Sequence, residues 1–318
     1  MAAAVSTTSQ VTAAVNAWLS STLLSRAYPY FVHAMWGQVQ DLPRNVGATI
    51  KFRKYASLTA ATTALTEGVT PNGSQLSVTD LSATPLQYGD YVTTSDYLDA
   101  TVIEPMKAEI ARLQGDQLGD TIDQLVRDVI IAGDTVQYAS SATSRATVAA
   151  GMILNGDEVR EAVMTLQGNN AKPVTSQIDP SSGFNSAPVA AAYIGILDQK
   201  TLFDLKKDAD WVPVEEYAAS DGKLGAFEKG KLDDVRFVLS SQAKTFSSTV
   251  TVHATLIMGQ EYYGISRISG EAINMYVNPP GSGEDPLHQR SSMGWKITLI
   301  AKRLQENFAV RVEHATTN

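Results

Sequence analysis

The sequence of 318 residues contains no cysteine. This absence excludes disulfide bonds, thiolate nucleophiles, cysteine-ligated zinc and iron–sulfur clusters together, so stability must come from packing and from partner chains. Charged residues are scarce, at 18% of the chain against roughly 25% in soluble globular proteins, so much of the surface is expected to be uncharged. No stretch approaches about 18 consecutive apolar residues, and residues 1–15 lack a basic segment followed by an apolar core. We therefore expect a cytosolic origin with no membrane span and no export signal.

The sequence also lacks the common catalytic motifs. It contains no GxxxxGK[ST] loop, no strand-linked GxGxxG, no HExxH and no GxSxG, which removes the usual support for nucleotide-binding, zinc-protease and serine-hydrolase functions. The four histidines are scattered, without i,i+4 pairing and without an Asp or Glu at ligand spacing. We therefore expect no metal site and no cofactor. These histidines are His33, His253, His288 and His314.

Charge is distributed unevenly along the chain. The net charge of −8 and the pI near 5.1 argue against a dedicated nucleic-acid binder, which would need many cations to neutralise phosphates. Five basic residues and only one acidic residue, Asp41, precede Glu67. Residues 1–66 therefore carry a net charge of +4, and residues 67–318 carry −12, which together give the net −8. The molecule is therefore polarised along its sequence.

The first hundred residues predict an arm followed by a projecting hairpin. Residues 5–25 carry apolar side chains at helical spacing within an Ala/Ser/Thr-rich stretch, so we expect a short helix that needs something to pack against. Residues 49–58 read as a strand, 67–73 as a turn-rich tip and 75–94 as the returning strand, with bends or edges at Pro85 and Gly89. Because an isolated hairpin is marginal in water, this one needs a partner surface.

The strongest helix signal spans residues 104–133. Apolar residues recur there at three- and four-residue steps, Pro105 suits the first turn and Gly133 stands where a C-cap belongs. Such a helix would be about 45 Å long. Gly115 and Gly119 weaken it or permit a bend or a close approach. Its opposite face carries an acidic stripe formed by Glu109, Asp116, Asp120 and Asp123.

The rest of the chain mixes helices and strands and therefore predicts an α+β fold. Residues 155–167 and 198–207 read as helices, the first capped by Asn155 or Asp157. The segments predicted as strands are 190–197, 235–239, 250–258, 295–303 and 308–312, and the last two look like a terminal antiparallel pair.

Four segments allow a chemical as well as a structural interpretation. The carboxylates of Asp116, Asp120 and Asp123 share a helix face and could perform acid–base chemistry, but a face that is solvated or covered by a basic partner is the preferred interpretation. The run 51–55 could bind nucleic acid, but a strand places Lys51 and Arg53 on one face and Lys54 on the other, which favours a charged edge strand. Loop 279–286 is a weak candidate for a phosphate cradle, and 289–296 is either functional or a buried polar junction.

Nine short motifs follow one another along nearly the whole chain: Arg26-Ala27-Tyr28-Pro29-Tyr30, Ile50-Lys51-Phe52-Arg53, Leu65-Thr66-Glu67-Gly68-Val69-Thr70-Pro71, Gln87-Tyr88-Gly89-Asp90-Tyr91-Val92, Arg127-Asp128-Val129-Ile130, Asn169-Asn170-Ala171-Lys172-Pro173, Asp208-Ala209-Asp210-Trp211, Pro286-Leu287-His288-Gln289-Arg290-Ser291-Ser292 and Gly294-Trp295-Lys296. In this order they resemble a group of tailed-bacteriophage major capsid proteins, the subgroup typified by the major coat protein of N4-like phages.

The resemblance implies the α+β capsid fold of phage Hong Kong ninety-seven. On this basis we expect an N-terminal arm at 1–47, an extended β-hairpin loop at 48–95 and a peripheral domain at 96–172 with a spine helix at 104–133. An axial domain is expected at 173–285, followed by C-terminal strands at 286–318 that return to the peripheral domain.

The resemblance further implies a structural protein, not an enzyme, that self-assembles into hexamers and pentamers of an icosahedral shell enclosing double-stranded DNA. Expected partners are further copies of the chain, scaffolding, portal and decoration proteins, and packaged DNA through non-specific contacts; no membrane partner is expected. The protein would be made in the host bacterial cytoplasm and reside in the virion capsid. We expect the hairpin of one subunit to lie over the acidic helix face of a neighbour. The expected interface residues are Lys51, Arg53, Lys54, Glu67, Tyr88, Tyr91, Glu109, Asp116, Asp120, Asp123, Arg290 and Trp295.

Two alternatives stay open. An α/β hydrolase-type enzyme with its carboxylate site on the 104–133 helix would require a concave pocket with convergent polar groups. A phage decoration or tail protein would differ from a capsid subunit in assembly geometry and not in chemistry.

Overall fold

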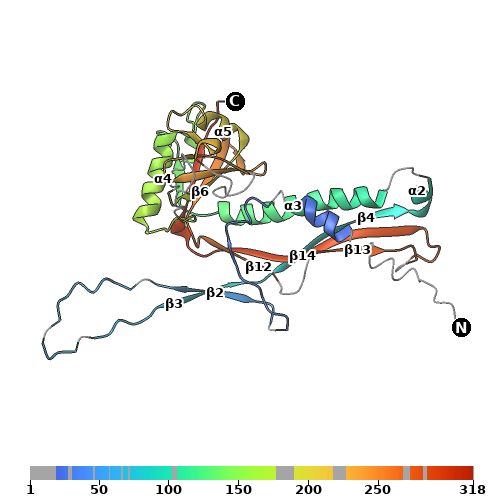
Figure 1. Ribbon diagram of the computed structural model, residues 1–318, viewed down its shortest axis with the longest axis horizontal. Coiled ribbons are helices and arrows are strands. Elements are labelled where there is room, and N and C mark those ends of the chain that lie inside the picture. Colours follow the sequence, from blue (N-terminus) through green and yellow to red (C-terminus); the bar gives the residue numbers. More distant parts are fainter. Residues whose placement is uncertain are drawn as a thin grey trace, which may run out of the picture.

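The computed structural model describes residues 19–27, 31–45, 47–56, 58–65, 67–70, 72–101, 106–176, 190–217, 227–267, 273–281 and 285–317. These residues form an elongated unit built on a five-stranded sheet, a more rounded unit built on an eight-stranded sheet, and a hairpin that projects from the elongated unit (Figure 1). The chain therefore has an α+β fold, as predicted.

The elongated unit consists of a long helix lying along one face of the five-stranded sheet (Figure 1). The strand order is β1 (Gln38–Val39), β12 (Tyr263–Arg267), β14 (Arg290–Arg303) and β13 (Asn274–Asn278), and β4 (Leu86–Ser95) pairs with the other edge of β14. Helix α2 (Asp96–Thr101) follows β4, and helix α3 (Met106–Ile131) covers the sheet. The predicted helix at 104–133 is thus confirmed, although Pro105 lies outside the described residues.

The C-terminal end of α3 is held by cationic and phenolic side chains. Arg303 donates from Nη1 to the carbonyl of Val129 at 2.7 Å, and the hydroxyl of Tyr262 donates to the carbonyl of Ile130. Arg311 donates to the carbonyl of Ile131. The last carbonyls of a helix lack partners within it and carry partial negative charge, so arginines satisfy and stabilise them.

The N-terminal arm packs on α3. Residues 19–27 are helical, and Leu19, Leu23 and Ala27, spaced four residues apart, are buried against the long helix. Gly115 permits this close approach, because a Cβ atom added there would stand 2.7 Å from the carbonyl oxygen of Leu23. The predicted arm helix, 5–25, is confirmed for residues 19–25; its residues before position 19 lie outside the described residues.

The rounded unit contains an eight-stranded sheet that is apolar on both faces. Its order is β5 (Val136–Tyr138), β15 (Ala309–His314), β11 (Thr251–Met258), β6 (Tyr193–Leu197), β9 (Val235–Leu239), β8 (Glu228–Leu232) and β7 (Val212–Pro213), and β10 (Thr245–Ser247) pairs with β11. Leu256 and Met258 of β11 belong to the cluster that includes α3, whereas Ile257 faces helices α4 (Gly156–Gly168) and α5 (Gln199–Leu205). Strands covered on both sides read as continuous apolar runs. A short helix, α6 (Val214–Tyr217), follows β7.

The two longer helices of this unit have side-chain N-caps. The side chain of Asn155 accepts a hydrogen bond from the backbone N–H of Glu158 at 3.0 Å, which confirms one of the two predicted caps of α4. Asp198 accepts from the backbone N–H of Thr201 at 3.1 Å at the start of α5. Such caps satisfy backbone donors that have no partner inside the helix.

Two sequence predictions about strand pairing are wrong or incomplete. Strands β14 and β15 do not pair with each other: the 3₁₀ helix η4 (Glu306–Phe308) turns the chain from one sheet into the other. The predicted return strand at 75–94 is divided, because β3 (Val78–Ala83) pairs with β2 (Ile50–Tyr55), whereas β4 joins the sheet of the elongated unit. Pro85 lies between β3 and β4, in line with the bend predicted there.

The segment boundaries expected from the resemblance also differ from the spatial grouping. Helix α4, placed at sequence level with the spine helix, packs on the eight-stranded sheet. Strands β12 and β13, placed in the axial segment, pair with β14 next to α3, and β15 joins the eight-stranded sheet. Each unit is therefore assembled from several separate stretches of the chain, and contiguous boundaries cannot describe it.

Candidate inter-subunit interface

The basic residues predicted for the interface lie on β2, at the root of the hairpin. Lys51 and Arg53 are exposed on one face of the strand, and Lys54 is half-buried on the other, which is the division that a two-residue period predicts. Arg53 Nε donates to Asp80 Oδ1 across the hairpin at 3.0 Å. This hydrogen bond lowers the pKa of Asp80 and raises the pKa of Arg53. Arg53 is therefore already matched by a carboxylate of its own hairpin.

The inner face of the hairpin root is fixed to the elongated unit. Ile50 and Phe52 alternate with the charged residues and form a small buried cluster with Leu42 and Ala83. The Phe52 ring lies against β12 at Gly264, where an added Cβ atom would stand 2.7 Å from it. The root is thus anchored by apolar packing, while the remainder of the hairpin extends beyond the body.

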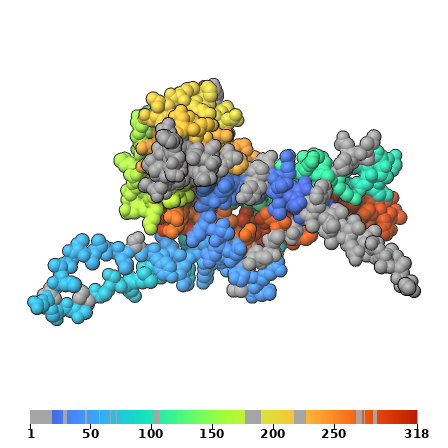
Figure 2. All heavy atoms as spheres, in the orientation of Figure 1, coloured from blue at the N-terminus to red at the C-terminus, as the bar shows by residue number. Residues whose placement is uncertain are grey.

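The arms of the hairpin stand clear of the other elements, as Figure 2 shows. The described arm residues 58–65, 67–70 and 72–77 are not in strands. Glu67 lies at the exposed tip beside Gly68, whose φ of +78° suits a residue without a Cβ atom. Large apolar side chains along the hairpin are 44–78% exposed. They are Tyr55, Leu58, Leu65, Val69, Leu76 and Val78.

The acidic stripe of α3 is not the open surface that the sequence suggests. Asp123 is completely buried: its carboxylate accepts the backbone N–H of His33 at 2.7 Å and contacts His33 Nδ1 at 2.6 Å. Asp116 Oδ2 pairs with Arg26 at 2.9 Å. The prediction that Asp123 meets a neighbouring subunit is therefore wrong, because the chain's own N-terminal arm covers this part of the helix.

The other two acids of the stripe are more accessible. Asp120 accepts a hydrogen bond from Gln242 Nε2 at 3.1 Å, and partial burial raises its pKa. Glu109 is exposed in the first turn and lies 3.5 Å from Arg112. The four predicted acids thus have different surroundings and do not form one continuous docking surface.

These contacts also weaken the case for a carboxylate active site. Asp120 lines a cavity of about 450 Å³ on α3, but neither Asp116 nor Asp123 lines it. Within the described ranges, no group of three His, Asp or Glu residues could hold a metal ion. No helix in the part of the chain that the structure describes is long and apolar enough to cross a membrane.

The remaining predicted interface residues lie on the five-stranded sheet. Trp295 is only 4% exposed and its Nε1 donates to Gln117 Oε1 of α3 at 3.2 Å, so its prediction as an interface residue is wrong. Tyr88 is half-buried and packs against the core. Tyr91 is 70% exposed, and Arg290 lies at the exposed start of β14. Alternation along β14 explains the difference, because odd-numbered positions around 293 face α3 and even-numbered ones face outward.

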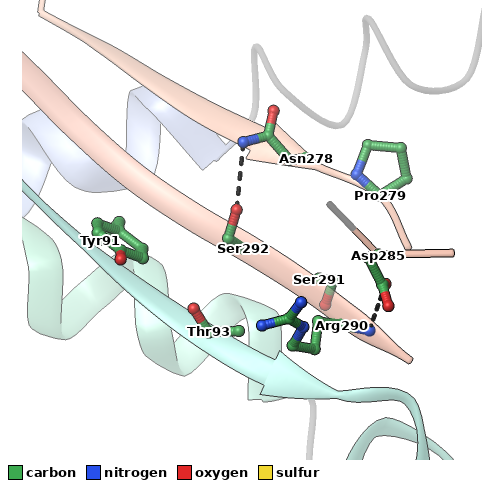
Figure 3. A pocket seen from close by; sticks show the side chains of 8 residues that line it. All are labelled: Tyr91, Thr93, Asn278, Pro279, Asp285, Arg290, Ser291 and Ser292. Atoms are coloured by element: carbon green, nitrogen blue, oxygen red, sulfur yellow. Dashed lines mark hydrogen bonds between the residues drawn. The ribbon is translucent and has the colours of Figure 1, made fainter. Parts of the chain in front are cut away.

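The face of the sheet opposite α3 carries a groove (Figure 3). Two cavities, of about 380 and 440 Å³, share Tyr91, Asn278 and Ser292 among their lining residues. Gly294 of β14 pairs with Tyr91 on one side and with Tyr276 on the other, so a glycine floor lies between two tyrosines. We call this feature, formed by Tyr91, Tyr276, Asn278, Ser292 and Gly294, the tyrosine groove.

One end of the tyrosine groove is shaped by an ordered turn. Asp285 accepts backbone hydrogen bonds from Arg290 at 2.8 Å and from Gly281 and Gln289 at 3.2 Å each, and these bonds lower its pKa. Figure 3 shows Arg290 and Asp285 beside each other there. The carboxylate therefore organises the loop, which supports the simple loop interpretation of this segment over a phosphate cradle.

Sequence reasoning missed several of these residues. Tyr276 and Asn278 of the groove carried no signal, because the pairing of β13 with β14 cannot be read from local patterns. The histidine–carboxylate pairs were also missed: His33 and Asp123 are 90 residues apart in sequence, and His253 Nδ1 lies 2.8 Å from Asp198 Oδ2. The segment 289–296, which the sequence suggested to be either functional or a buried polar junction, was the one available indication of the groove.

Comparison with known proteins identifies the fold. No family model and no curated protein matches the sequence. The capsid of Ralstonia phage GP4 superposes with a TM-score of 0.71 at 13% identity, covering 89% of this chain and 87% of that one. The Cyanophage Pam1 capsid gives 0.60 at 14% identity over 93% of each chain. The head structure of Helicobacter pylori bacteriophage KHP40 gives 0.61 at 13% identity over 87% of each. The chain therefore has the Hong Kong ninety-seven-like capsid fold, as the resemblance led us to expect.

Proposed function

We propose that this chain is the major capsid protein of a tailed phage and assembles with copies of itself into the hexamers and pentamers of an icosahedral shell around double-stranded DNA. The similarity to phage capsid and head structures extends over about nine-tenths of the chain. The observation that carries the proposal is the projecting hairpin on a subunit with this fold. Its root is anchored by buried apolar residues, whereas its long arms expose large apolar side chains and are not paired in strands.

The hairpin is poorly suited to a subunit that works alone. Its exposed apolar side chains and unpaired backbone groups would favour unspecific association if nothing covered them. Burial against another subunit would both remove the apolar side chains from water and order the arms. A subunit of a shell provides such a cover on every copy.

On this proposal the elongated unit around α3 is the peripheral domain, and the rounded unit with the eight-stranded sheet is the axial domain near the capsomer centre. Residues 19–45 belong to the N-terminal arm. The order of the motifs supports assignment to the subgroup of N4-like phages. Scaffolding, portal and decoration proteins and the packaged DNA are the further proposed partners, and the virion capsid is the proposed location.

The direct test is electron microscopy of the purified chain together with light scattering for its mass in solution. We expect closed shells or rings of five and six subunits. A compact monomer or dimer at every concentration and salt, also after co-expression with the scaffolding protein of its own phage, would contradict the proposal. A decoration or tail protein would instead form trimers or tubes.

Charge reversal at the hairpin root tests its role in assembly. We expect the variant with Lys51, Arg53 and Lys54 all replaced by Glu to remain folded and to form no closed shells. Because Arg53 already pairs with Asp80, the single change Lys51→Glu is the sharper variant, and Lys206→Glu at the exposed end of α5 is its matched control. An exposed pair contributes about 0.2–1 kcal/mol, so Lys51→Glu should lower shell yield without abolishing it. Normal yield in the triple variant would contradict the role.

A further inference from the structure

We propose that Asn72, in the returning arm of the hairpin, is a site of spontaneous deamidation, in which the backbone nitrogen of Gly73 displaces the side-chain amide and a carboxylate remains at position 72. The sequence contains two Asn-Gly dipeptides, Asn72-Gly73 and Asn155-Gly156. Glycine has no side chain, so its backbone nitrogen can approach the preceding side chain closely. The two dipeptides share this chemistry, and the structure distinguishes them.

Asn72 and Gly73 can reach the geometry of this reaction. Both residues are exposed, and they lie beyond the paired part of the hairpin, which ends at Tyr55 and Val78. Neither is hydrogen-bonded to any other described residue. A Cβ atom added to Gly73 would meet nothing within 4 Å. The side chain of Asn72 and the nitrogen of Gly73 can therefore rotate toward each other without breaking a contact with the described parts of the chain.

The second dipeptide is held away from this geometry. Asn155 is the N-cap of α4, and its side-chain oxygen accepts the backbone N–H of Glu158 at 3.0 Å. The backbone N–H of Gly156, which is buried, donates to Asp208 Oδ2 at 2.8 Å. Asn155 is itself exposed, so access to water does not separate the two sites. The same ring closure here requires both hydrogen bonds to open, and the reaction is therefore limited to the locally opened state.

The reaction needs only water and hydroxide. The backbone nitrogen of Gly73 gives its proton to hydroxide and bonds to Asn72 Cγ, which closes a small imide ring. The bond from Cγ to Nδ2 breaks, and that nitrogen takes a proton from water and leaves as ammonia, which restores the hydroxide. Water then opens the ring at either carbonyl. The product is an aspartate or, when the backbone carbonyl is attacked, an isoaspartate whose backbone runs through Cγ.

The new carboxylate limits the time for which a free subunit can still assemble. Glu67 is the only charged residue among residues 58–77, so the conversion doubles the negative charge of the arms. This step rests on the proposed self-assembly: where the arms are covered in a shell, an ionised carboxylate costs more to remove from water than the amide that it replaces. The isoaspartate also lengthens the backbone of the arm by one methylene. A subunit that stays unassembled therefore loses its capacity for assembly with time.

Peptide mapping by mass spectrometry measures the conversion of both asparagines in the same chain. The dilute, unassembled full chain is kept in warm, mildly alkaline buffer and sampled over several days. We expect position 72 to be converted almost completely before any conversion of Asn155 is detectable, and the rate at position 72 to fall as the pH is lowered.

The variant Gly73→Val identifies the attacking atom. Its branched side chain shields the backbone nitrogen, and the open space at Gly73 leaves the fold unchanged, so the conversion of Asn72 should become much slower. Equal rates at the two asparagines of the unmodified chain, or an unchanged rate at position 72 in Gly73→Val, would overturn the proposal.

Assembly of aged subunits tests the consequence separately. Asn72→Gln is the matched control, because its longer side chain closes a larger ring and reacts far more slowly. We expect the fraction of aged unmodified chain that forms shells to fall about fivefold or more, since each shell buries the new charge on many copies, whereas aged Asn72→Gln keeps the yield of its fresh form. Full conversion without loss of yield would overturn the limited lifetime. If the fresh chain formed no rings or shells under any condition, the proposed function would fail, while the conversion at position 72 would still be measurable in that chain.

Discussion

A buried histidine in the eight-stranded sheet predicts that the folded subunit is sensitive to acid. His314 on β15 is fully buried; its Nε2 lies 3.0 Å from Thr255 Oγ1 and its Nδ1 lies 2.9 Å from the carbonyl oxygen of Ala315. The His253 ring is stacked on it at 6.1 Å. Burial lowers the pKa of His314 from 6.5 to about 4, although the hydrogen bond with the carbonyl oxygen of Ala315 opposes this shift.

The sign and size of the effect follow from proton linkage. Between pH 6.5 and about 4 the unfolded chain binds a proton that the folded chain excludes, so the free energy of unfolding falls as the pH falls and levels off below that range. A difference of about 2.5 pKa units corresponds to about 3 kcal/mol, a large share of the roughly 5–15 kcal/mol typical of native proteins. Asp198 affects stability in a separate and lower pH range. Burial opposes its ionisation, but hydrogen bonds from His253 and Thr201 lower its pKa from 3.8 to about 2.

The assay is urea unfolding of the unassembled subunit, followed by tryptophan fluorescence at several pH values and one protein concentration. His314→Gln removes the titrating group and should flatten the slope between pH 6.5 and 4. His288→Gln at an exposed position is the control and should keep the slope. If His314→Gln retained the full wild-type slope in this window, the reasoning would be refuted, because the proton uptake would then belong to another group.

Three further predictions concern apolar packing, helix packing and ion pairs. Phe52→Ala should remove about 3–5 kcal/mol of packing free energy from the hairpin root. The root should then come loose, and a protease should cleave the hairpin faster while the body stays folded. An equally protected hairpin would contradict the anchoring role of Phe52. Gly115→Ala and Gly168→Ala each gain about 1 kcal/mol of helix propensity, but only Gly115→Ala forces a Cβ atom to 2.7 Å from Leu23, so it alone should raise hydrogen exchange in residues 19–27. Arg145→Met leaves the buried carboxylate of Glu313 with Arg311 alone and should lower the free energy of unfolding by about 1.5–3 kcal/mol. Arg267→Met, which breaks the exposed pair with Asp41, should cost less than about 1 kcal/mol in the same urea titration.

The parts of the fold that could be predicted from sequence are those set by local periodicity and capping. Helix α3 was predictable because apolar residues recur along 26 residues, and the cap of α4 because Asn155 directly precedes it. Strand partners were not predictable in the same way. The segment after residue 303 looks like a hairpin turn, yet β14 continues one sheet and β15 joins another, because pairing depends on burial across the whole fold.

For the candidate interface, the sequence indicated which residues are exposed better than it indicated which residues contact each other. The alternation of Lys51 and Phe52 on β2 and the exposure of Tyr91 followed from strand period. Asp116 and Asp123 looked available because the residues that contact them, Arg26 and His33, are 90 positions away. Trp295 was predicted as an interface residue because it is an aromatic residue that follows a polar run. The sequence does not indicate that α3 of the same chain covers the face of the strand on which it lies.

The free energies expected for one hairpin contact indicate why the proposed assembly should be all-or-none. Half-burial of six apolar side chains contributes on the order of 6 kcal/mol, whereas joining two subunits costs an estimated 4–15 kcal/mol in lost freedom. A single hairpin contact between two subunits is therefore marginal, and an open dimer should be scarce. Closing a ring adds one more contact without fixing another subunit, since the ends are already held near each other. Sedimentation over a concentration series should accordingly show monomers and closed assemblies with little between them, and a stable population of dimers would mean that one contact is far stronger than its exposed apolar area allows.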